Sequence, residues 1–232
     1  LNLEAVEPEI PRIPVKVLYQ KMVVGSPRAQ RENFQIEMVL YDHTDHRLLH
    51  EAVELFVRLL PPGSYTSFTV PATDIVMMQA LSGSPFLLVE PRVNYALDLR
   101  GLTPDHFDVD DQVGLAAIDD ANALGGIASR CRNPFDRVHA DPAFSTDVAD
   151  AYLGVFASES VKGFADAVFK ISDKKGIPYG FLAVNQPVVR LGYRVSKLVL
   201  AAADASVARG SLSALLKAVT AWCIHQQADY LT

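Results

Sequence analysis

The chain has few cysteines, only Cys131 and Cys223 in 232 residues. They lie far apart in sequence, and neither belongs to the Cys-x-x-Cys pair that is typical of thiolate metal sites. Two cysteines are also too few for a disulfide framework. We interpret them as reduced, partly buried thiols and predict a cytoplasmic protein.

Long apolar runs and basic runs are also missing. No run approaches the roughly 20 apolar residues that a membrane span needs, so we expect no membrane partner. The formal net charge is −6, and no basic patch marks a nucleic-acid surface, so we expect no nucleic-acid partner. Residues 1–14 mix acids with prolines and do not form a secretory signal.

Hydrophobic residues make up 50% of the chain, enough for a sizeable core. Apolar patterns predict a first α/β unit over residues 1–100 and, after a turn-rich acidic linker at 100–111, a second unit over 112–232. The first unit is predicted to hold strands at 15–19, 34–41, 67–70, 86–89 and 93–99, with helices at 51–60 and from Thr73 or Asp74 to Leu81.

The second unit has a different order of predicted strands and helices. Strands are predicted at 113–118, 167–171, 177–184, 188–203 and 230–232, and helices from Asp119 or Asp120 to Ser129, at 146–160 and at 212–226. The order β-α-α-β-β-β-α-β indicates a mixed sheet flanked by helices rather than a repeating βαβ fold.

The chain end from 198 to 226 reads as a strand, a glycine turn and a helix. The first N–H groups of a helix have no partner inside it, so Arg209-Gly210-Ser211 predicts a cradle for an anion.

Four segments carry a resemblance to a known family. They are Phe135-Asp-Arg-Val-His-Ala-Asp-Pro-Ala-Phe144, Gly180-Phe-Leu, Leu200-Ala-Ala-Ala with Arg209-Gly210, and Val219-Thr-Ala-Trp222. With this order of elements, they resemble the GNAT N-acyltransferase superfamily, and more closely its members of the dTDP-fucosamine kind that acetylate amino-sugar nucleotides. The resemblance implies a GNAT-like mixed sheet with an N-terminal α/β subdomain, acetyl-CoA or another acyl-CoA as cofactor, a small-molecule amine as substrate, and a homodimer as one arrangement.

The resemblance also implies where the cofactor binds. A bulge in the fourth strand of the family opens a slot for pantetheine, which here falls on Lys197, Leu198, Val199 and Leu200. The diphosphate falls on the turn and helix start, at Arg209, Gly210, Ser211 and Ser213.

The polar loop from Phe135 to Phe144 contains candidates for binding the acceptor amine. His139 and Asp141 are candidates to move the amine proton, since histidine titrates near neutrality. Arg137 is a candidate to bind the acceptor; the alternative is a structural loop in which Asp141 caps and Arg137 pairs with an acid such as Asp136. Asn185 either faces the acceptor or turns the chain.

Three differences from the family leave a second function open. Val207 and Leu212 replace the turn's usual Gln or Arg and its second small residue, and no residue matches the family's C-terminal asparagine loop, last helix and final strands with their tyrosine. The alternatives are therefore a GNAT-like protein without acetyl transfer, which binds an acyl donor for decarboxylation or carrier loading, or a structural module in a larger assembly. We expect no metal, because the histidines at 43, 46 and 50 read as a solvated loop leading into a helix.

Overall fold

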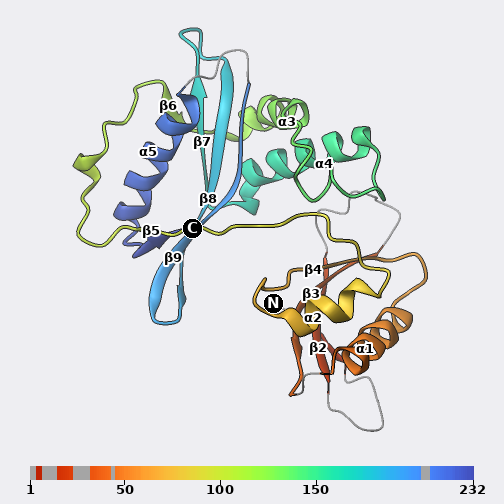
Figure 1. Cartoon of the computed structure of the whole chain (residues 1–232). Helices are drawn as coiled ribbons and strands as arrows, with labels where there is room; N and C mark the ends of the chain where they lie inside the picture. The colour runs from red at the N-terminus through yellow and green to blue at the C-terminus, as the bar shows by residue number, and fades with distance from the viewer. Residues whose placement is uncertain (1–3, 7–14, 23–31, 43–44, 205–209) are drawn as a thin grey trace. The chain divides into compact units, whose positions relative to one another are not determined.

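The computed structural model describes residues 4–6, 15–22, 32–42, 45–204 and 210–232. The chain forms two compact units, Leu1–Val89 and Glu90–Thr232, called here the first and second units (Figure 1). The sequence places the change of unit at 100–111. In the structure, β5 (Leu97–Asp98) already pairs within the sheet of the second unit.

The first unit is a four-stranded sheet with two helices. Its strands β1 (Glu4–Val6), β2 (Lys16–Met22), β3 (Asn33–Leu40) and β4 (Tyr65–Phe68) lie in sequential order. The first three are antiparallel, whereas β4 runs parallel to β3 because α1 (His46–Leu59) crosses over between them. A second helix, α2 (Ile75–Ser82), follows and is capped by Asp74 as the sequence predicts.

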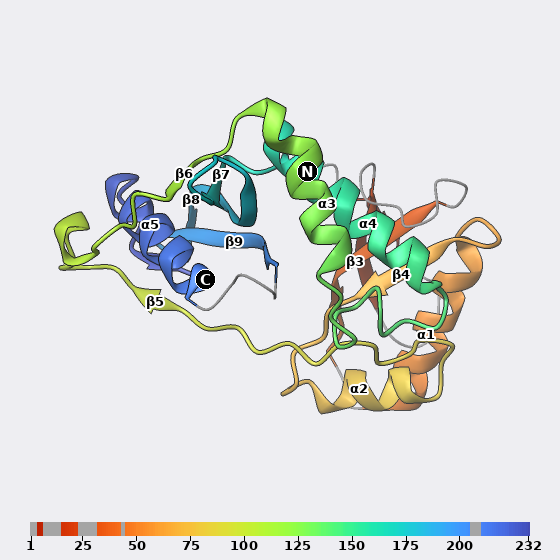
Figure 2. The same cartoon turned by 90° about the horizontal axis from the view of Figure 1, so that it is seen from above.

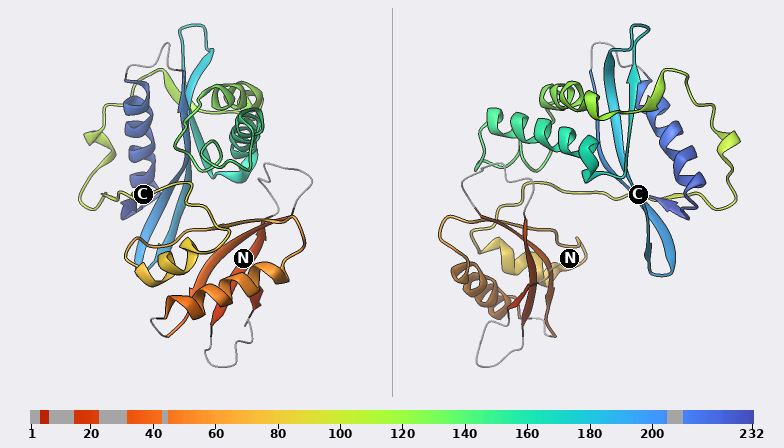
Figure 3. Two further views of the ribbon diagram at one scale, coloured as in Figure 1. Left: turned by 45° about the vertical axis from the view of Figure 1, so that its right-hand side comes forward. Right: turned by 180° about the vertical axis from the view of Figure 1, so that it is seen from behind.

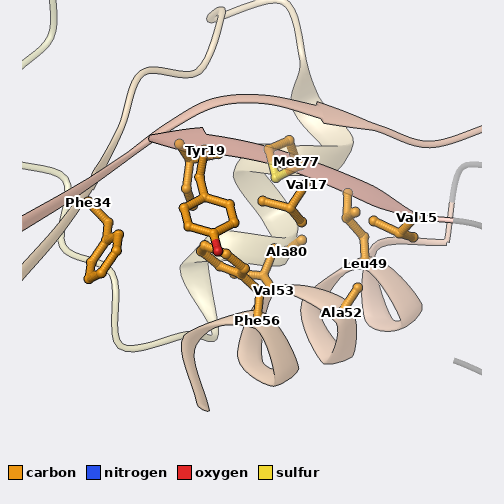
Figure 4. Packing of buried hydrophobic residues seen from close by; sticks show 11 residues of the cluster. Val15, Val17, Tyr19, Phe34, Leu49, Ala52, Val53, Phe56, Met77 and Ala80 are labelled. Carbon is orange, nitrogen blue, oxygen red and sulfur yellow. The ribbon is translucent and has the colours of Figure 1, made fainter. Parts of the chain in front are cut away.

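The core of the first unit follows from two periodicities. Val15, Val17 and Tyr19 alternate along the chain and point to one face of the sheet. Helix α1 meets them with buried residues at helical spacing, Leu49, Ala52, Val53 and Phe56. The rings of Tyr19 and Phe56 pack edge to face at 5.1 Å (Figure 4), so strand and helix share one apolar core.

The second unit has the element order that the sequence predicts. After β5 come β6 (Val113–Leu115), α3 (Ala121–Arg130), α4 (Thr146–Glu159), β7 (Ala167–Ser172), β8 (Pro178–Arg190), β9 (Tyr193–Ala203), α5 (Ser211–His225) and β10 (Tyr230–Leu231). The sheet order is β5-β10-β9-β8-β7-β6, in which only β9 and β10 pair in parallel.

Helices cover both faces of this sheet (Figures 2 and 3). Helix α5 packs on one face through Leu215, Val219 and Cys223. Helices α3 and α4 pack on the other face through Leu124, Ile127 and Ala157. No helix among the described residues is long and apolar enough to cross a membrane.

Three strand predictions were wrong in whole or in part: of the predicted strand at 93–99, only Leu97–Asp98 forms a strand. Residues 86–89 form no strand, and Leu87 and Leu88 are exposed. The predicted strand at 188–203 is instead a hairpin: β8 continues to Arg190, Leu191 and Gly192 turn the chain, and β9 starts at Tyr193.

Both units contain the same arrangement of a bulged strand, a crossover helix and a parallel strand. In the second unit, Ala183 faces Leu200 and Val184 faces Leu198, so Val199 is an extra residue on β9. In the first unit, Leu18 faces Met38 and Tyr19 faces Ile36, so Glu37 is extra on β3 in the same way. In each unit the parallel strand pairs no further than the residue before the bulge, Leu198 in one and Ile36 in the other.

Candidate functional site

The bulge on β9 changes the face of the sheet on which successive residues lie. Leu198 still packs with the α5 cluster, whereas Val199 and Leu200 both pack with the α3–α4 cluster. Two successive residues on one face break the alternation of a regular strand, as a bulge does. The N–H of Leu198 donates to Thr232 O at 2.7 Å, the last bond that β9 makes with the β10 segment.

Of the four residues predicted to line a cofactor slot, Lys197 is exposed and the others are half-buried. The amide of Leu198 is already bonded inside the sheet. The backbone of Val199 and Leu200 follows Leu198 directly, and Val199 is the bulged residue itself. Of the four residues, Val199 and Leu200 are therefore the two at the bulge, and their contact with a cofactor stays a prediction.

The turn before α5 forms the second part of the candidate site. Gly210 has φ +90°, a left-handed conformation that glycine adopts without steric cost, and no side chain caps the helix within the described part of the chain. Ser211 is buried at the helix start, whereas Leu212 and Ser213 are exposed. The predicted contact at Arg209 lies outside the described residues.

Helix α1 in the first unit begins differently. Its cap is Asp45, whose carboxylate accepts from the N–H of Arg47 at 2.9 Å. A carboxylate at a helix start occupies the place where an anion would bind. Among the helices that follow the two bulged strands, α5 is therefore the one suited to an anionic ligand.

His139 lies between two carboxylates. Its Nδ1 is 2.7 Å from Asp136 Oδ2 and its Nε2 is 3.0 Å from Asp150 Oδ1, and its side chain is only 6% exposed. Burial alone would lower the pKa of His139, but the hydrogen bonds to Asp150 and Asp136 outweigh it and raise that pKa above its usual value. An imidazolium with both nitrogens bonded has no lone pair with which to accept a proton from an amine.

Asp150 completes a charged network. Arg132 donates to it at 2.6 and 2.9 Å. The pKa of Asp150 is lowered by Arg132 and then by His139. This network holds the loop before α4 against that helix, so its role here is to stabilise the fold.

The remaining predicted acceptor residues have partners of their own or lie elsewhere. Arg137 donates to the hydroxyl of Tyr152 at 2.9 Å rather than to Asp136. Asp141 is buried and accepts from the N–H of Ala143 at 2.8 Å, a turn contact. Asn185 faces Lys197 across the β8–β9 pair, and its buried Oδ1 accepts no hydrogen bond from the described residues.

The loop and the bulged strand meet at one contact. The thiol of Cys131, where the loop begins, donates to Ala203 O at the end of β9 at 3.2 Å. Burial raises the pKa of this thiol, so it stays protonated and is a poor nucleophile. The structure thus brings Asn185, Lys197 and the bulge together, whereas His139, Arg137 and Asp141 lie in the loop before α4, where Arg137 and His139 bond to that helix.

Sequence reasoning missed Asp150, Arg132 and Tyr152, the partners of the loop. Asp136 and His139 are three residues apart in one turn, a spacing that could have revealed their contact. Asp150 lies 11 residues from His139 on the next helix, and no local pattern announces that contact. Within the described residues, no cluster of three or more His, Cys, Asp or Glu side chains could hold a metal ion.

Solved structures show which fold this is. A crystal structure of a GCN5-related N-acetyltransferase from Sphaerobacter thermophilus aligns with a TM-score of 0.52 and 12% identity, over 93% of this chain and 66% of its own. The chain therefore has a GNAT-like mixed α/β fold with its sheets flanked by helices.

Two further likenesses are too weak to support an argument. A ribosomal-protein-alanine N-acetyltransferase from Brucella melitensis aligns with a TM-score of 0.38 and 13% identity, over 52% of this chain and 77% of its own. N-myristoyltransferase from Saccharomyces cerevisiae with bound myristoyl-CoA aligns with a TM-score of 0.44 and 11% identity, over 94% and 59%. No protein-family model and no curated protein sequence matches the chain.

Proposed function

We propose that the second unit binds an acyl-coenzyme A and transfers its acyl group to an amine. The observation that carries this proposal is the bulge at Val199, on the strand that precedes a helix whose start at Gly210 has no side-chain cap among the described residues. A bulged strand at one end and an uncapped helix N-terminus at the other suit a ligand with an amide-bearing arm and an anionic head.

The chain's contribution to such a reaction would be binding and orientation. The first N–H groups of α5, near Gly210, Ser211 and Ser213, would hold the diphosphate. Backbone groups at Val199 and Leu200 would hold the amide-bearing arm and polarise the carbonyl. The bound cofactor supplies the activated thioester, and holding the amine beside it lowers the barrier.

The acceptor side supports a narrower proposal. We place the amine near Asn185 and Lys197, because this pair lies beside the bulge and the Asn185 Oδ1 lacks a donor among the described residues. An amino-sugar nucleotide is our first choice of acceptor, on the resemblance of the loop around Arg137. Since His139 is bonded on both sides, the amine would have to lose its proton to water or to a residue other than His139.

Calorimetric titration with acetyl-CoA tests the cofactor. We expect one site per chain, because Asp45 caps the corresponding helix of the first unit. The Gly210→Asp variant is expected to bind at least about tenfold more weakly, since it places a carboxylate where the diphosphate would lie. Gly101→Asp is the matched control, because Gly101 also has a positive φ of +79° and lies away from the bulge. No heat at millimolar acetyl-CoA, or equal binding by both variants, would contradict the proposal.

Acetyl transfer to a panel of amines tests the reaction. Product from an amino-sugar nucleotide, but not from free amino acids or polyamines, would support the narrower proposal. Asn185→Ala is expected to raise KM for the amine while leaving acetyl-CoA binding unchanged. The expected homodimer and cytoplasmic location remain predictions.

The alternative is a GNAT-like protein that binds an acyl donor without acetyl transfer. The two hydrogen bonds of His139 favour this alternative. Both of its ring nitrogens are bonded to carboxylates, so the one histidine of the candidate loop cannot serve as a base in this arrangement. Acetyl-CoA binding together with the absence of transfer to every amine tested would select this alternative.

A further inference from the structure

The hairpin of β8 and β9 extends beyond the sheet that carries it (Figure 1). On one side, β7 pairs with β8 only as far as Val184; on the other, β10 pairs with β9 only from Val195. Within the described part of the chain, residues 188–193, called here the hairpin tip, therefore form a ribbon of two strands without a third, whereas the next residue, Arg194, already bonds to Asp229 just before β10. Such a ribbon is marginally stable in water by itself.

The hairpin tip is apolar and exposed. Val188 is 51%, Val189 73% and Leu191 99% exposed, and Tyr193 is 45% exposed. Leu191 also has φ +50°, a conformation that Asn or Gly adopts at less cost in a two-residue hairpin turn. A leucine that is strained and fully exposed contributes nothing to the fold, which indicates a role in contact with something else.

The flanks of the tip are basic. Arg190, Arg194 and Lys197 are exposed, and residues 186–197 contain no acid, a local charge of +3 in a chain of net charge −6. Two acids lie beside these flanks: Asp229 accepts from the backbone N–H of Arg194, and Asp166 from that of Gln186. The guanidinium of Arg194 donates to the carbonyls of Gln226 and Gln227, and the Asp229 carboxylate beside it offsets part of its charge, so Arg190 is the exposed cation of the tip itself.

We propose that the hairpin tip docks on an anionic lipid bilayer. Leu191 and Val189 enter the boundary of the acyl chains, and Arg190 faces the headgroups. A second copy of the same hairpin is a poorer partner, because it would bring like charges together. The absence of a run that could span a bilayer predicts no membrane partner, but a tip that lies on the membrane surface needs no spanning segment.

The position of the tip is compatible with the proposed acyl transfer without depending on it. Strand β9 leads from the tip at Tyr193 to Ala203, about 33 Å at about 3.3 Å per residue. The turn at Gly210 follows the far end of the strand. Docking through the tip would thus leave that turn open to water.

Co-sedimentation of the full chain with vesicles tests the proposal. We expect binding to phosphatidylcholine vesicles containing about a third phosphatidylserine, little binding to phosphatidylcholine alone, and weaker binding in high salt. Leu191→Asn is expected to lower the bound fraction at least about fivefold, because it removes the most exposed apolar side chain. Its thermal midpoint should stay equal or rise, since Asn tolerates a positive φ.

The matched control is Ile177→Asn, which changes a 59%-exposed side chain in the turn at the other end of β8. It should bind vesicles like the unchanged protein. Equal binding by Leu191→Asn, or no binding to anionic vesicles, would overturn the proposal. So would a lowered midpoint for Leu191→Asn, which would assign the side chain to the fold, or a Leu191-dependent dimer in light scattering without vesicle binding.

Discussion

At the scale of single residues, His139 sets a pH dependence of stability. Its pKa is raised in the folded chain, so its stabilising contribution is fully present below the unfolded value of about 6.5 and is lost as pH rises through the folded pKa. Unfolding in urea, followed by the fluorescence of Trp222, should therefore show falling stability above pH 6.5. Trp222 is the only tryptophan and packs on Phe169, so it reports the second unit alone.

The variant His139→Gln tests this assignment. Its free energy of unfolding should be about 2 kcal/mol lower at pH 6, because the carboxylates of Asp136 and Asp150 lose a charged partner. Its stability should also vary less between pH 6 and pH 9. His46→Gln, an exposed histidine at the start of α1, is the control and should keep the full pH dependence. An unchanged slope in His139→Gln would assign the dependence to another group.

At the scale of elements, α3 and α4 cross at two glycines. A Cβ added to Gly125 would lie 2.9 Å from Gly154 O and would clash with Ser158 Oγ. Gly125→Ala should therefore push the helices apart and cost about 1–3 kcal/mol in the same Trp222 unfolding measurement.

Gly126→Ala is the matched control in the same helix. Its added Cβ would meet only the flexible end of Arg130 at 3.4 Å, and alanine is the better helix former by about 1 kcal/mol. It should leave stability unchanged or raise it. If both variants were equally destabilised, the close helix crossing would not be the cause.

The elements also show where sequence reasoning works. Helices α2 and α3 were predicted to within a few residues, because apolar spacing is a local signal. The predicted cap at Asp74 of α2 is confirmed, whereas the predicted side-chain cap of α3 was wrong, since Asp120 makes no such bond. The β8–β9 hairpin was missed because Val188 to Val195 continues a strand pattern, and its turn uses Leu191 where Asn would have marked it. The cofactor site at the bulge and the turn stays a prediction, and the Asp150 partner of His139 comes from a helix that no local pattern links to it.

At the scale of the whole molecule, the chain has two separate cores. The core of the first unit is built from β2, β3, α1 and α2, and those of the second from β7 to β10 and its helices. Composition and turn residues predicted two units, but they placed the linker at the acidic turns of 100–111. Apolar residues at 86–95 read as strands because β propensity records side-chain type and not burial.

Limited proteolysis distinguishes these two placements of the linker. Leu87, Leu88, Val93 and Tyr95 are 64–82% exposed on a segment with no strand pairing among the described residues. Chymotrypsin should therefore cut first at Leu87, Leu88 or Tyr95. Because each unit encloses its own core, the C-terminal fragment should keep the urea midpoint that Trp222 reports in the whole chain. First cuts within 100–111 would show that residues 86–95 are protected. A lower urea midpoint in the fragment would show that the second unit depends on the first for its stability.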